Sequence, residues 1–357
     1  MNEKNVQLLS DLIRMRTISS QVENVNRATD RIHQELAAAG LFCRIEDING
    51  KKCLFASTVD DKQVDYLLNA HVDVVPADDE AMFEPQIKDG YMYARGTSDC
   101  LGACVCIVDI LRRLQGQNVS CGAIFSADEE IGGFTTGAML DRGYAAKKAA
   151  VIIDASWGAI AYAQKGIMVV KLTAVSSSGG GHSSAPWAFE NPVEMLMEDY
   201  LQIRSKWGEQ PSREDHWKNS ISPTMISGGF VHNQIPSEAS LTLNIRFIEK
   251  GEAAKIEKLI RENTRCKVDV SVDCLPVVAD PDQGEIVKLR QVMTDSLQKD
   301  VKLIRMDGAT DARYFERLNI PVAILGLDGN GAHAPKEYLR IDSMDEMADM
   351  MVKFIGS

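Results

Sequence analysis

The chain has 357 residues, of which 45% are hydrophobic and 25% are charged, and this composition excludes an intrinsically disordered or collagen-like protein. Its 51 acidic residues exceed its 39 basic residues, and the resulting net charge of −12 argues against a nucleic-acid partner. No apolar stretch reaches the roughly 18 residues of a membrane span and charges interrupt the N-terminal segment, so we expect a cytoplasmic protein without a membrane partner.

The first 155 residues alternate between helical and strand patterns. Residues 3–16 and 26–39 carry apolar side chains at three- and four-residue spacing, which predicts two helices, and Gly40 ends the second. A third, more apolar helix is expected at about 101–115. Strands are expected in four short apolar runs, at 52–58, 65–70, 121–126 and 149–153. This alternation is typical of an α/β domain with a mainly parallel sheet and helices on both faces.

The pattern changes after Lys165. One strand is followed by the loop SSSGGGHSS, and the elements up to residue 275 complete a β-α-β-β-α-β order, the ferredoxin-like split motif. They are a helix at about 191–206, strands at 221–231 and 238–248, a helix at 251–264 and a strand at 267–275. Alternation of the first kind resumes near residue 283. We therefore expect one α/β domain (1–164 and 277–357) interrupted by an inserted α+β domain (165–276).

Eight cysteines lie mostly inside apolar segments and lack the spacing of a zinc knuckle. In a reducing compartment they are expected to be small buried hydrophobic residues. Cys100, Cys104 and Cys106 form the densest group, but only Cys100 and Cys104 share a face of the predicted helix. We therefore expect no three-thiolate metal site there.

Acidic side chains and one histidine follow the apolar strands directly. His71 lies at the end of YLLNAH and Asp154 at the end of AAVIID, whereas Asp99 lies where the next helix begins. In open α/β sheets, ligands bind at the carboxyl ends of the strands. If the strands are parallel neighbours, seven side chains meet at one rim: His71, Asp73, Asp99, Asp128, Glu129, Glu130 and Asp154.

Several carboxylates at one rim repel one another. Two like charges ~4 Å apart cost about 4 kcal/mol at an effective dielectric near 20, so such a cluster binds protons or cations. Histidine together with Asp and Glu is the ligand set of zinc and its first-row neighbours. A single strand-end Asp is usually a turn or capping residue, and adjacent Glu residues are usually solvated. Four such positions together predict a metal site, and the number of ligands suits two ions better than one.

Short motifs across nearly the whole chain occur in the order of one known family. They are HVDVVP (71–76), ARGTSDCLGA (94–103), DEE (128–130), Asp154 after VII, GHSSAP (181–186), NQIP (233–236), Arg246, GATDAR (308–313) and GAHAPKEY (331–338). On these motifs the chain resembles the dinuclear-zinc metallopeptidase family of glutamate carboxypeptidase, aminoacylase, acetylornithine deacetylase, succinyl-diaminopimelate desuccinylase and related dipeptidases. The inserted domain matches what that family calls its lid or dimerisation domain.

The resemblance implies a ligand set for two divalent metal ions. Asp99 would bridge the two ions, His71 and Asp154 would complete the shell of one, and Glu130 with His333 would complete the shell of the other. Zinc is the expected metal, with cobalt and manganese as alternatives. Three ligand carboxylates and a hydroxide nearly neutralise the four positive charges of two such ions.

The resemblance also implies two further catalytic residues. Glu129 would be the general base that acts on a water between the metals, because metal coordination lowers the pKa of water from 15.7 to about 7. Asp73 would orient the imidazole of His71, since alternate residues of a strand point the same way. The residues alone do not say which of Glu129 and Glu130 is the base, and that assignment comes from the resemblance.

The inserted domain and the last third of the chain contain the residues expected to touch the substrate. In the resembled enzymes the GHSS histidine, here His182, stabilises the tetrahedral oxyanion, often from the neighbouring subunit of a dimer. Such a donor contributes on the order of 3 kcal/mol. Asn233 and Arg246 would bind the substrate carbonyl and carboxylate, and Arg suits a planar carboxylate clamp. Thr310 and Arg313 are candidates for the free end of the substrate. The structural alternatives are an exposed flexible loop for His182 and a strand-surface residue for Arg246.

Two positions depart from the family pattern. Leu101 stands where many members have Lys, which removes a positive charge near the cleft. Asp154 stands where the deacetylase and desuccinylase branches usually have Glu. The second departure favours carboxypeptidase, dipeptidase or aminoacylase chemistry.

We therefore predict a two-metal hydrolase that cleaves an amide bond next to a free α-carboxylate, in a dipeptide, at a C-terminal residue or in an N-acyl amino acid. One alternative is a non-catalytic protein that binds amino acids or peptides on the same fold. Another is an aminopeptidase that requires a free α-amine. Family geometry also favours a homodimer formed through the inserted domain, because its GHSS loop reaches its own cleft with difficulty if the domains stand apart.

Overall fold

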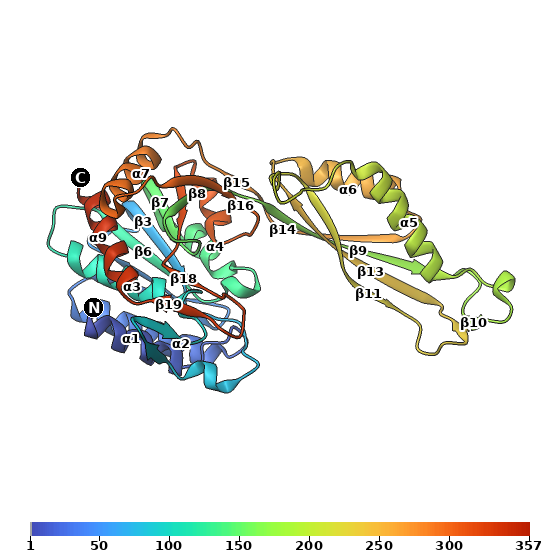
Figure 1. Cartoon of the computed structure of the whole chain (residues 1–357), viewed down its shortest axis with the longest axis horizontal. Helices are drawn as coiled ribbons and strands as arrows, with labels where there is room; N and C mark the ends of the chain where they lie inside the picture. The colour runs from blue at the N-terminus through green and yellow to red at the C-terminus, as the bar shows by residue number, and fades with distance from the viewer. Residues whose placement is uncertain (1) are drawn as a thin grey trace. The chain divides into compact units, whose positions relative to one another are not determined.

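The computed structural model describes residues 2–357, which divide into two units (Figure 1). The first unit contains the chain up to Ala163 together with Val277–Arg305 and Thr310–Ser357. The second contains Gln164–Pro276 and the short segment Met306–Ala309. We expected this segment in the first unit. It lies with the second because the side chain of Asp307 pairs there with Lys165 Nζ at 2.7 Å and with His216 Nδ1 at 2.9 Å.

A nine-stranded sheet forms the centre of the first unit, in the order β1-β2-β6-β3-β7-β17-β8-β15, with β16 beside β8. Its four central strands, β6, β3, β7 and β17, run parallel, whereas β1, β2 and β8 pair antiparallel at the two sides. The predicted mainly parallel sheet is therefore confirmed at the centre. The strands are β1 (Phe42–Ile48), β2 (Lys51–Ser57), β3 (Gln63–His71), β6 (Cys121–Ser126), β7 (Ala145–Ile153), β8 (Ala159–Gln164), β15 (Val277–Val278), β16 (Lys302–Met306) and β17 (Val322–Leu325).

Helices cover both faces of this sheet. Every residue of β6 is buried, although successive side chains of a strand point to opposite faces, so each face must have a covering layer. Helix α3 is almost wholly buried because its sequence LGACVCIVDIL is apolar on nearly every side, and it packs against α1, α2 and α9. Helix α4 packs instead with α8 and against β1, β2 and β6. The helices are α1 (Glu3–Arg14), α2 (Val22–Ala38), α3 (Leu101–Leu114), α4 (Phe134–Asp141), α7 (Gly284–Leu297), α8 (Ala312–Phe315) and α9 (Asp342–Gly356), with 3-10 turns η1 (Glu80–Phe83), η2 (Glu129–Ile131) and η4 (Glu316–Leu318).

A second, four-stranded sheet of the first unit has the order β18-β19-β5-β4. Its strands are β4 (Gln86–Lys88), β5 (Tyr91–Tyr93), β18 (Gly329–Asn330) and β19 (Tyr338–Arg340). Strand β19 pairs antiparallel with β5, in the register Tyr338↔Tyr93. This pairing places the loop after β5 next to the loop before β19, although the two are about 240 residues apart in the sequence.

The second unit has the expected ferredoxin-like arrangement. Its sheet has the antiparallel order β11-β13-β9-β14, and helices α5 and α6 lie along one face (Figure 1). Alternate residues of β13, such as Leu241, Leu243 and Ile245, are buried in a core that is separate from the core of the first unit. The elements are β9 (Gly166–Val175), β10 (Gly181–His182), η3 (Pro186–Ala188), α5 (Pro192–Trp207), β11 (Ser220–Gly228), β12 (Gln234–Ile235), β13 (Glu238–Phe247), α6 (Glu252–Glu262) and β14 (Lys267–Cys274).

Across residues 2–357, the helices are all too short or too polar to span a lipid bilayer.

Candidate metal centre

The carboxyl ends of three parallel strands deliver the predicted ligands. Strand β3 ends at His71, η2 follows β6 and contains Glu129 and Glu130, and Asp154 comes directly after β7. Because β6, β3 and β7 are adjacent and parallel, these ends lie at one edge of the sheet. Asp99 lies two residues before α3 begins.

The two carboxylate oxygens of Asp99 face two different histidines. Oδ1 lies 3.0 Å from His71 Nε2, and Oδ2 lies 3.3 Å from His333 Nε2. Further out, Asp154 Oδ1 is 4.0 Å from His71 Nε2, whereas Glu130 Oε2 is 3.0 Å from His333 Nε2. The structure thus brings all five predicted ligands together, in two groups that share Asp99.

Asp73 connects His71 to the turn that contains the two glutamates. His71 Nδ1 lies 2.8 Å from the backbone carbonyl of Asp73 and 3.5 Å from its Oδ1. If Nδ1 donates its proton to this carbonyl, the lone pair of Nε2 is left for a metal. The Asp73 carboxylate accepts hydrogen bonds from the backbone N–H groups of Glu129 (3.0 Å) and Glu130 (3.3 Å), and from Ser19 Oγ (2.7 Å). It therefore positions the glutamates as well as lying beside the imidazole.

The pKa values of the carboxyl groups reflect burial among like charges. Burial, together with the neighbouring carboxylates, raises the pKa of Glu129 to about 8 and that of Glu130 to about 7. Burial also raises the pKa of Asp154, whereas hydrogen bonds from His333 and His71 outweigh burial and lower the pKa of Asp99. Without a bound cation, the surroundings of Glu129, Glu130 and Asp154 therefore disfavour their ionised forms.

This donor set fits divalent cations. One ligand atom from each of His71, Asp99 and Glu130 lies within 4.8 Å of the other two. Glu130 Oε1 is buried without a hydrogen-bond partner among the described residues, an arrangement that is costly unless a cation or water approaches it. Carboxylate oxygens and imidazole nitrogens are ligands of zinc, cobalt and manganese.

Stability of chelator-treated protein should fall as the pH rises. Glu129 and Glu130 have folded-state pKa values raised from about 4.5, so the unfolded state releases their protons at lower pH. Their contribution is therefore intact below pH 4.5 and is lost progressively up to about pH 8. One pKa unit corresponds to about 1.4 kcal/mol, and 1 kcal/mol to about 2–4 °C for a domain of the size of the first unit, so we expect its melting temperature to fall by about 5 °C or more between pH 6 and 8.5. Differential scanning calorimetry checks this.

Saturating zinc should weaken that pH dependence, because ligation of Glu130 favours its charged form. The variant Glu129→Gln should weaken the pH dependence in chelator-treated protein. A melting temperature that rises steadily with pH after chelation would contradict the raised pKa values of Glu129 and Glu130.

Two predicted substrate-binding residues lie at or just before the start of α8. The side chain of Arg313 is 6% exposed, with Nη2 3.4 Å from Glu129 Oε1 and 3.8 Å from Asp311 Oδ1. Thr310 is also buried, and its hydroxyl accepts the backbone N–H of Ala312 at 3.1 Å as α8 begins. Their proposed contacts with the free end of a substrate stay predictions.

Asp128 is not directed toward the ligand groups. Its Oδ2 lies 3.1 Å from Lys51 Nζ, and its Oδ1 accepts hydrogen bonds from the backbone and side chain of Thr135. The residue therefore serves the turn between β6 and α4, as a strand-end Asp usually does.

In the second unit, His182 and Asn233 lie close together. His182 in β10 pairs with Gln234 in β12, and the backbone N–H of Ser183 donates to the carbonyl of Asn233 at 3.0 Å. The exposed ring of His182 accepts the backbone N–H of Ser184 at Nδ1 (3.2 Å), which leaves Nε2 as the ring's N–H donor.

The structure does not bring Arg246 to this pair. Arg246 lies near the end of β13, and its Nε donates to Asn244 Oδ1 at 3.1 Å. The hairpin with Asn233 precedes Glu238 at the other end of the strand. At about 3.4 Å per residue, Glu238 and Arg246 are about 27 Å apart along β13.

Sequence reasoning gave no role to Cys100 or Glu337. The Sγ of Cys100 groups with ligand atoms of His71 and Asp154 within 4.8 Å, and its thiol donates to the carbonyl of Ile153 at 3.0 Å. Burial raises the pKa of Cys100 to about 12. Its position directly after Asp99 was the available signal, whereas Glu337 lay inside GAHAPKEY without any charge or spacing pattern to single it out.

Residues 67–357 match the family model "Peptidase family M20/M25/M40", which covers most of the chain. The chain belongs to this family. A relative from Staphylococcus aureus, named "Probable succinyl-diaminopimelate desuccinylase", is 25% identical over 99% of this chain and 95% of its own length. The family and its desuccinylase and peptidase members make this M20 chain a hydrolytic enzyme.

Solved structures of family members have the same fold. The M20 metallo-carboxypeptidase Sso-CP2 from Sulfolobus solfataricus superposes with a TM-score of 0.85 over 100% of this chain and 99% of that one, at 16% identity. A Bacillus subtilis protein described as a dinuclear metal-binding peptidase of the M20 family has a TM-score of 0.70 over 99% of this chain and 97% of that one, at 14% identity. At these identities the likeness establishes the fold, including the mainly parallel sheet.

Proposed function

We propose that this M20 chain is a two-metal hydrolase that cleaves an amide bond next to a free carboxylate. Its substrate is a dipeptide, a C-terminal residue of a peptide or an N-acyl amino acid. The observation that carries the proposal is Asp99, whose two oxygens face His71 and His333, while the backbone of Glu129 is hydrogen-bonded to Asp73 beside His71. A cytoplasmic location stays a prediction from the sequence.

Five residues would hold the ions. His71 and Asp154 serve one ion, Glu130 and His333 the other, and Asp99 serves both. Two bound divalent ions, with zinc as the proposed metal, supply Lewis acidity for the amide carbonyl and lower the pKa of a water molecule to about 7.

Glu129 is the proposed proton carrier. Its side chain is 12% exposed, and its Oε1 lies 3.4 Å from Arg313 Nη2, which leaves the other oxygen for a water molecule. Glu129 takes a proton from this water and later gives it to the leaving amine. A carboxylate whose pKa lies near the working pH suits both steps. His182 is the proposed donor to the oxyanion of the tetrahedral intermediate, and Asn233 and Arg246 the proposed partners of the substrate carbonyl and carboxylate.

A substrate panel tests the proposal. Wild-type protein is loaded with zinc, cobalt or manganese and assayed against unblocked dipeptides, N-acyl amino acids and N-succinyl-diaminopimelate. We expect hydrolysis of at least one dipeptide or of an N-acyl amino acid other than the succinyl compound. Exclusive hydrolysis of the succinyl compound would align the chain with its desuccinylase relatives and contradict the preference drawn from Asp154.

The same panel, with dipeptides of amidated C-terminus added, separates the alternatives. An aminopeptidase ignores N-acyl amino acids and hydrolyses the amidated dipeptides as well as the unblocked ones, because it requires only the free α-amine. A binding protein without catalytic activity binds members of the panel in calorimetry and hydrolyses none with any metal. Either result would remove the proposed cleavage next to a free carboxylate.

His182→Ala should lower kcat about 100-fold or more and change KM little. The reason is that a hydrogen bond to the oxyanion exists mainly in the transition state, and loss of one such donor costs roughly 100- to 1,000-fold in kcat. Steady-state kinetics measure both constants. The control is His33→Ala on helix α2, which should behave as wild type. Equal kcat in wild type and His182→Ala would remove His182 from the mechanism.

We also propose a homodimer formed through the second unit. His182 pairs with the hairpin that precedes Glu238, whereas Arg246 lies near the other end of β13. Glu238 and Arg246 are about 27 Å apart along this strand, which exceeds the length of a dipeptide. If both contact one substrate, they must come from two chains.

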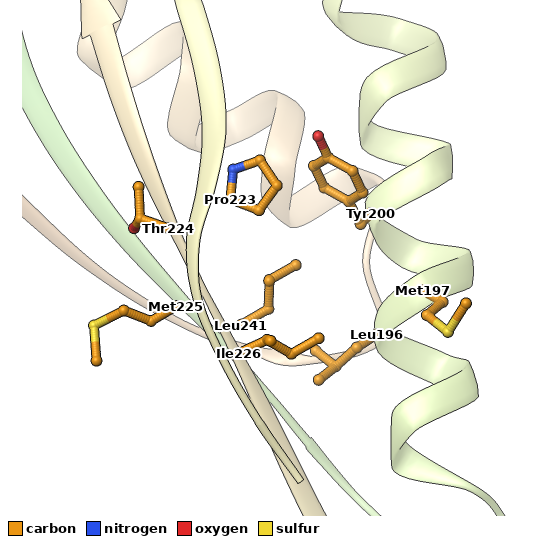
Figure 2. Close-up of a pocket in the computed structure, with 8 residues that line it drawn as sticks. All are labelled: Leu196, Met197, Tyr200, Pro223, Thr224, Met225, Ile226 and Leu241. Atoms are coloured by element: carbon orange, nitrogen blue, oxygen red, sulfur yellow. The ribbon is translucent and has the colours of Figure 1, made fainter.

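The outer edge of this sheet supports such an interface. Among the described strands β11 pairs only with β13, so its other edge is open to a second strand. Met225 and Ile226 of β11 are each 69% exposed, and Met197 and Leu201 of α5 are exposed beside them. A cavity of about 270 Å³ opens between the two elements, lined mainly by apolar side chains (Figure 2). Its lining residues are Leu196, Met197, Tyr200, Pro223, Thr224, Met225, Ile226 and Leu241.

Ile226→Lys should convert the dimer to a monomer. The lysine places an unpaired charge in an apolar interface, and such a group costs several kcal/mol, which weakens dimerisation by more than about 100-fold. Sedimentation velocity measures the mass. The matched control is Val272→Lys, an exposed residue of β14 at the opposite edge of the same sheet, which should remain dimeric. A fully active wild-type monomer would contradict the interface.

A further inference from the structure

The loops that contain Asp99 and His333 are joined by one buried carboxylate, Glu337. The first loop follows β5 and the second precedes β19, and these strands are hydrogen-bonded neighbours. Glu337 comes four residues after His333 and one residue before β19. Its side chain has no exposed surface.

Both carboxylate oxygens of Glu337 are occupied by donors from the loop that contains Asp99. Oε1 accepts the backbone N–H groups of Ser98 at 2.9 Å and Asp99 at 3.1 Å, and the Ser98 hydroxyl at 3.2 Å. Oε2 accepts Arg95 Nη1 at 2.7 Å and the backbone N–H of Gly96 at 2.9 Å. Five donors converge on one acceptor-only group, which only an ionised carboxylate can satisfy at both oxygens.

The segment between His333 and Glu337 is folded tightly, so the position of one residue constrains the other. The backbone N–H of Ala334 donates to the carbonyl of Gly331 at 2.9 Å. Gly331 has a φ of 82°, and a Cβ there would lie 2.3 Å from the carbonyl oxygen of Lys336, so the chain passes close to itself.

His333 depends on this segment because little else surrounds it. Its side chain is 57% exposed, whereas the side chain of His71 is 2% exposed and is fixed by its surroundings. The position of the His333 ring near Asp99 Oδ2 and Glu130 Oε2 must therefore come mainly from the backbone of its loop.

We propose that Glu337 is a positioning residue that sets the distance between Asp99 and His333 and thereby the affinity of the metal position formed by Glu130 and His333. The inference rests on the two-metal centre of the proposed function. Glu337 touches neither substrate nor ion, and it acts through the backbone of Asp99 on one side and through the loop of His333 on the other. Loss of such supporting hydrogen bonds typically costs 10- to 100-fold in metal affinity.

Glu337→Gln tests this proposal with metal binding as the readout. The amide keeps the size of the side chain but turns an NH2 group toward donors at one of its two ends. Zinc and cobalt affinities are measured by competition with a chromogenic chelator, and metal content by mass spectrometry, on the full-length protein. We expect one of the two ions to bind 10- to 100-fold less tightly and the other to bind within about 3-fold of wild type.

Asp199→Asn is the matched control. Asp199 is a buried carboxylate of the second unit that accepts hydrogen bonds from Thr264 Oγ1, from the backbone N–H of Arg265 and from Arg265 Nε. Its replacement disturbs a comparable network and touches no predicted ligand. We expect Asp199→Asn to melt at a lower temperature and to bind both ions with wild-type affinity.

Three results would overturn the proposal. The first is wild-type affinity for both ions in Glu337→Gln, which would leave Glu337 a purely structural role. The second is equal weakening of metal binding in Asp199→Asn, which would trace the loss to general instability. The third applies if Glu337→Gln does not fold: Ser98→Ala, which removes one hydrogen bond to Oε1, should then weaken the same ion about 3-fold or more, and unchanged affinity would count against Glu337.

Failure of the proposed function gives a different result. A wild-type protein that binds two ions and hydrolyses no member of the substrate panel would contradict the hydrolase, while the comparison of Glu337→Gln with Asp199→Asn would still be decided by metal affinity.

Discussion

Glu129→Gln is expected to abolish hydrolysis while the protein keeps its full metal content. A general base contributes roughly 100- to 10,000-fold, and the amide of Gln cannot accept a proton from water, so kcat should fall by about 1,000-fold or more. The ions should remain because their proposed ligands are unchanged. Steady-state kinetics together with metal analysis check both expectations in one preparation.

Glu84→Gln is the control for this variant. Glu84 is an exposed carboxylate of the same unit, in an ion pair with Arg14 at 3.1 Å, and its replacement should leave kcat unchanged. A Glu129→Gln protein with near-normal kcat would remove Glu129 as the base. Loss of metal from the variant would indicate instead that Glu129 is a ligand and that its role and that of Glu130 are exchanged.

Removal of divalent cations is expected to stop hydrolysis and to destabilise the protein. The ions are bound only by the folded state, and a ligand present at 1,000 times its dissociation constant stabilises by about 4.1 kcal/mol. At about 2–4 °C for each kcal/mol, chelation should lower the melting temperature by roughly 8–16 °C at pH 8. Activity and melting temperature should both return when zinc is added back.

The variant His333→Ala shows how much of the stabilisation by metal comes from each of the two metal positions. Its ring contacts Asp99 and Glu130, whereas His71 serves the other group, so the variant should retain one ion and part of the stabilisation. Full activity in chelated protein, with metal analysis showing no bound ion, would contradict the two-metal hydrolase.

Much of the first unit could be predicted because strands with apolar side chains on both faces have a strong signal. The apolar runs at 65–70, 121–126 and 149–153 correspond to β3, β6 and β7. Their adjacency could not be read from periodicity. It was assumed from the strand–helix alternation, and it is this adjacency that brings His71, Glu130 and Asp154 to one edge.

The short strands were missed for the opposite reason. Strands β4, β5, β18 and β19 have two or three residues each, too few for any alternation to be visible, and their pairing joins residues about 240 positions apart. This small sheet brings the loops of Asp99 and His333 together. His333 was therefore accessible only through the resemblance of GAHAPKEY to a known family, and Glu337 was missed altogether.

In the second unit, the positions of predicted substrate-binding residues also depend on tertiary contacts that the sequence pattern does not reveal. Asn233 and Arg246 were assigned to the same substrate, but Asn233 lies in the hairpin before β13 and Arg246 near the far end of that strand. The segment Met306–Ala309 was assigned to the first unit by its place in the chain, whereas the ion pairs of Asp307 attach it to the second. Both outcomes follow from tertiary partners that are distant in sequence.

Each unit closes its own hydrophobic core, and this separation has a consequence for how members of the family can diverge. Side chains of the inserted unit can change without repacking the layers that support the acidic rim. A chimaera that exchanges Gln164–Pro276 between family members should therefore fold, provided that Met306–Ala309 is transferred with it.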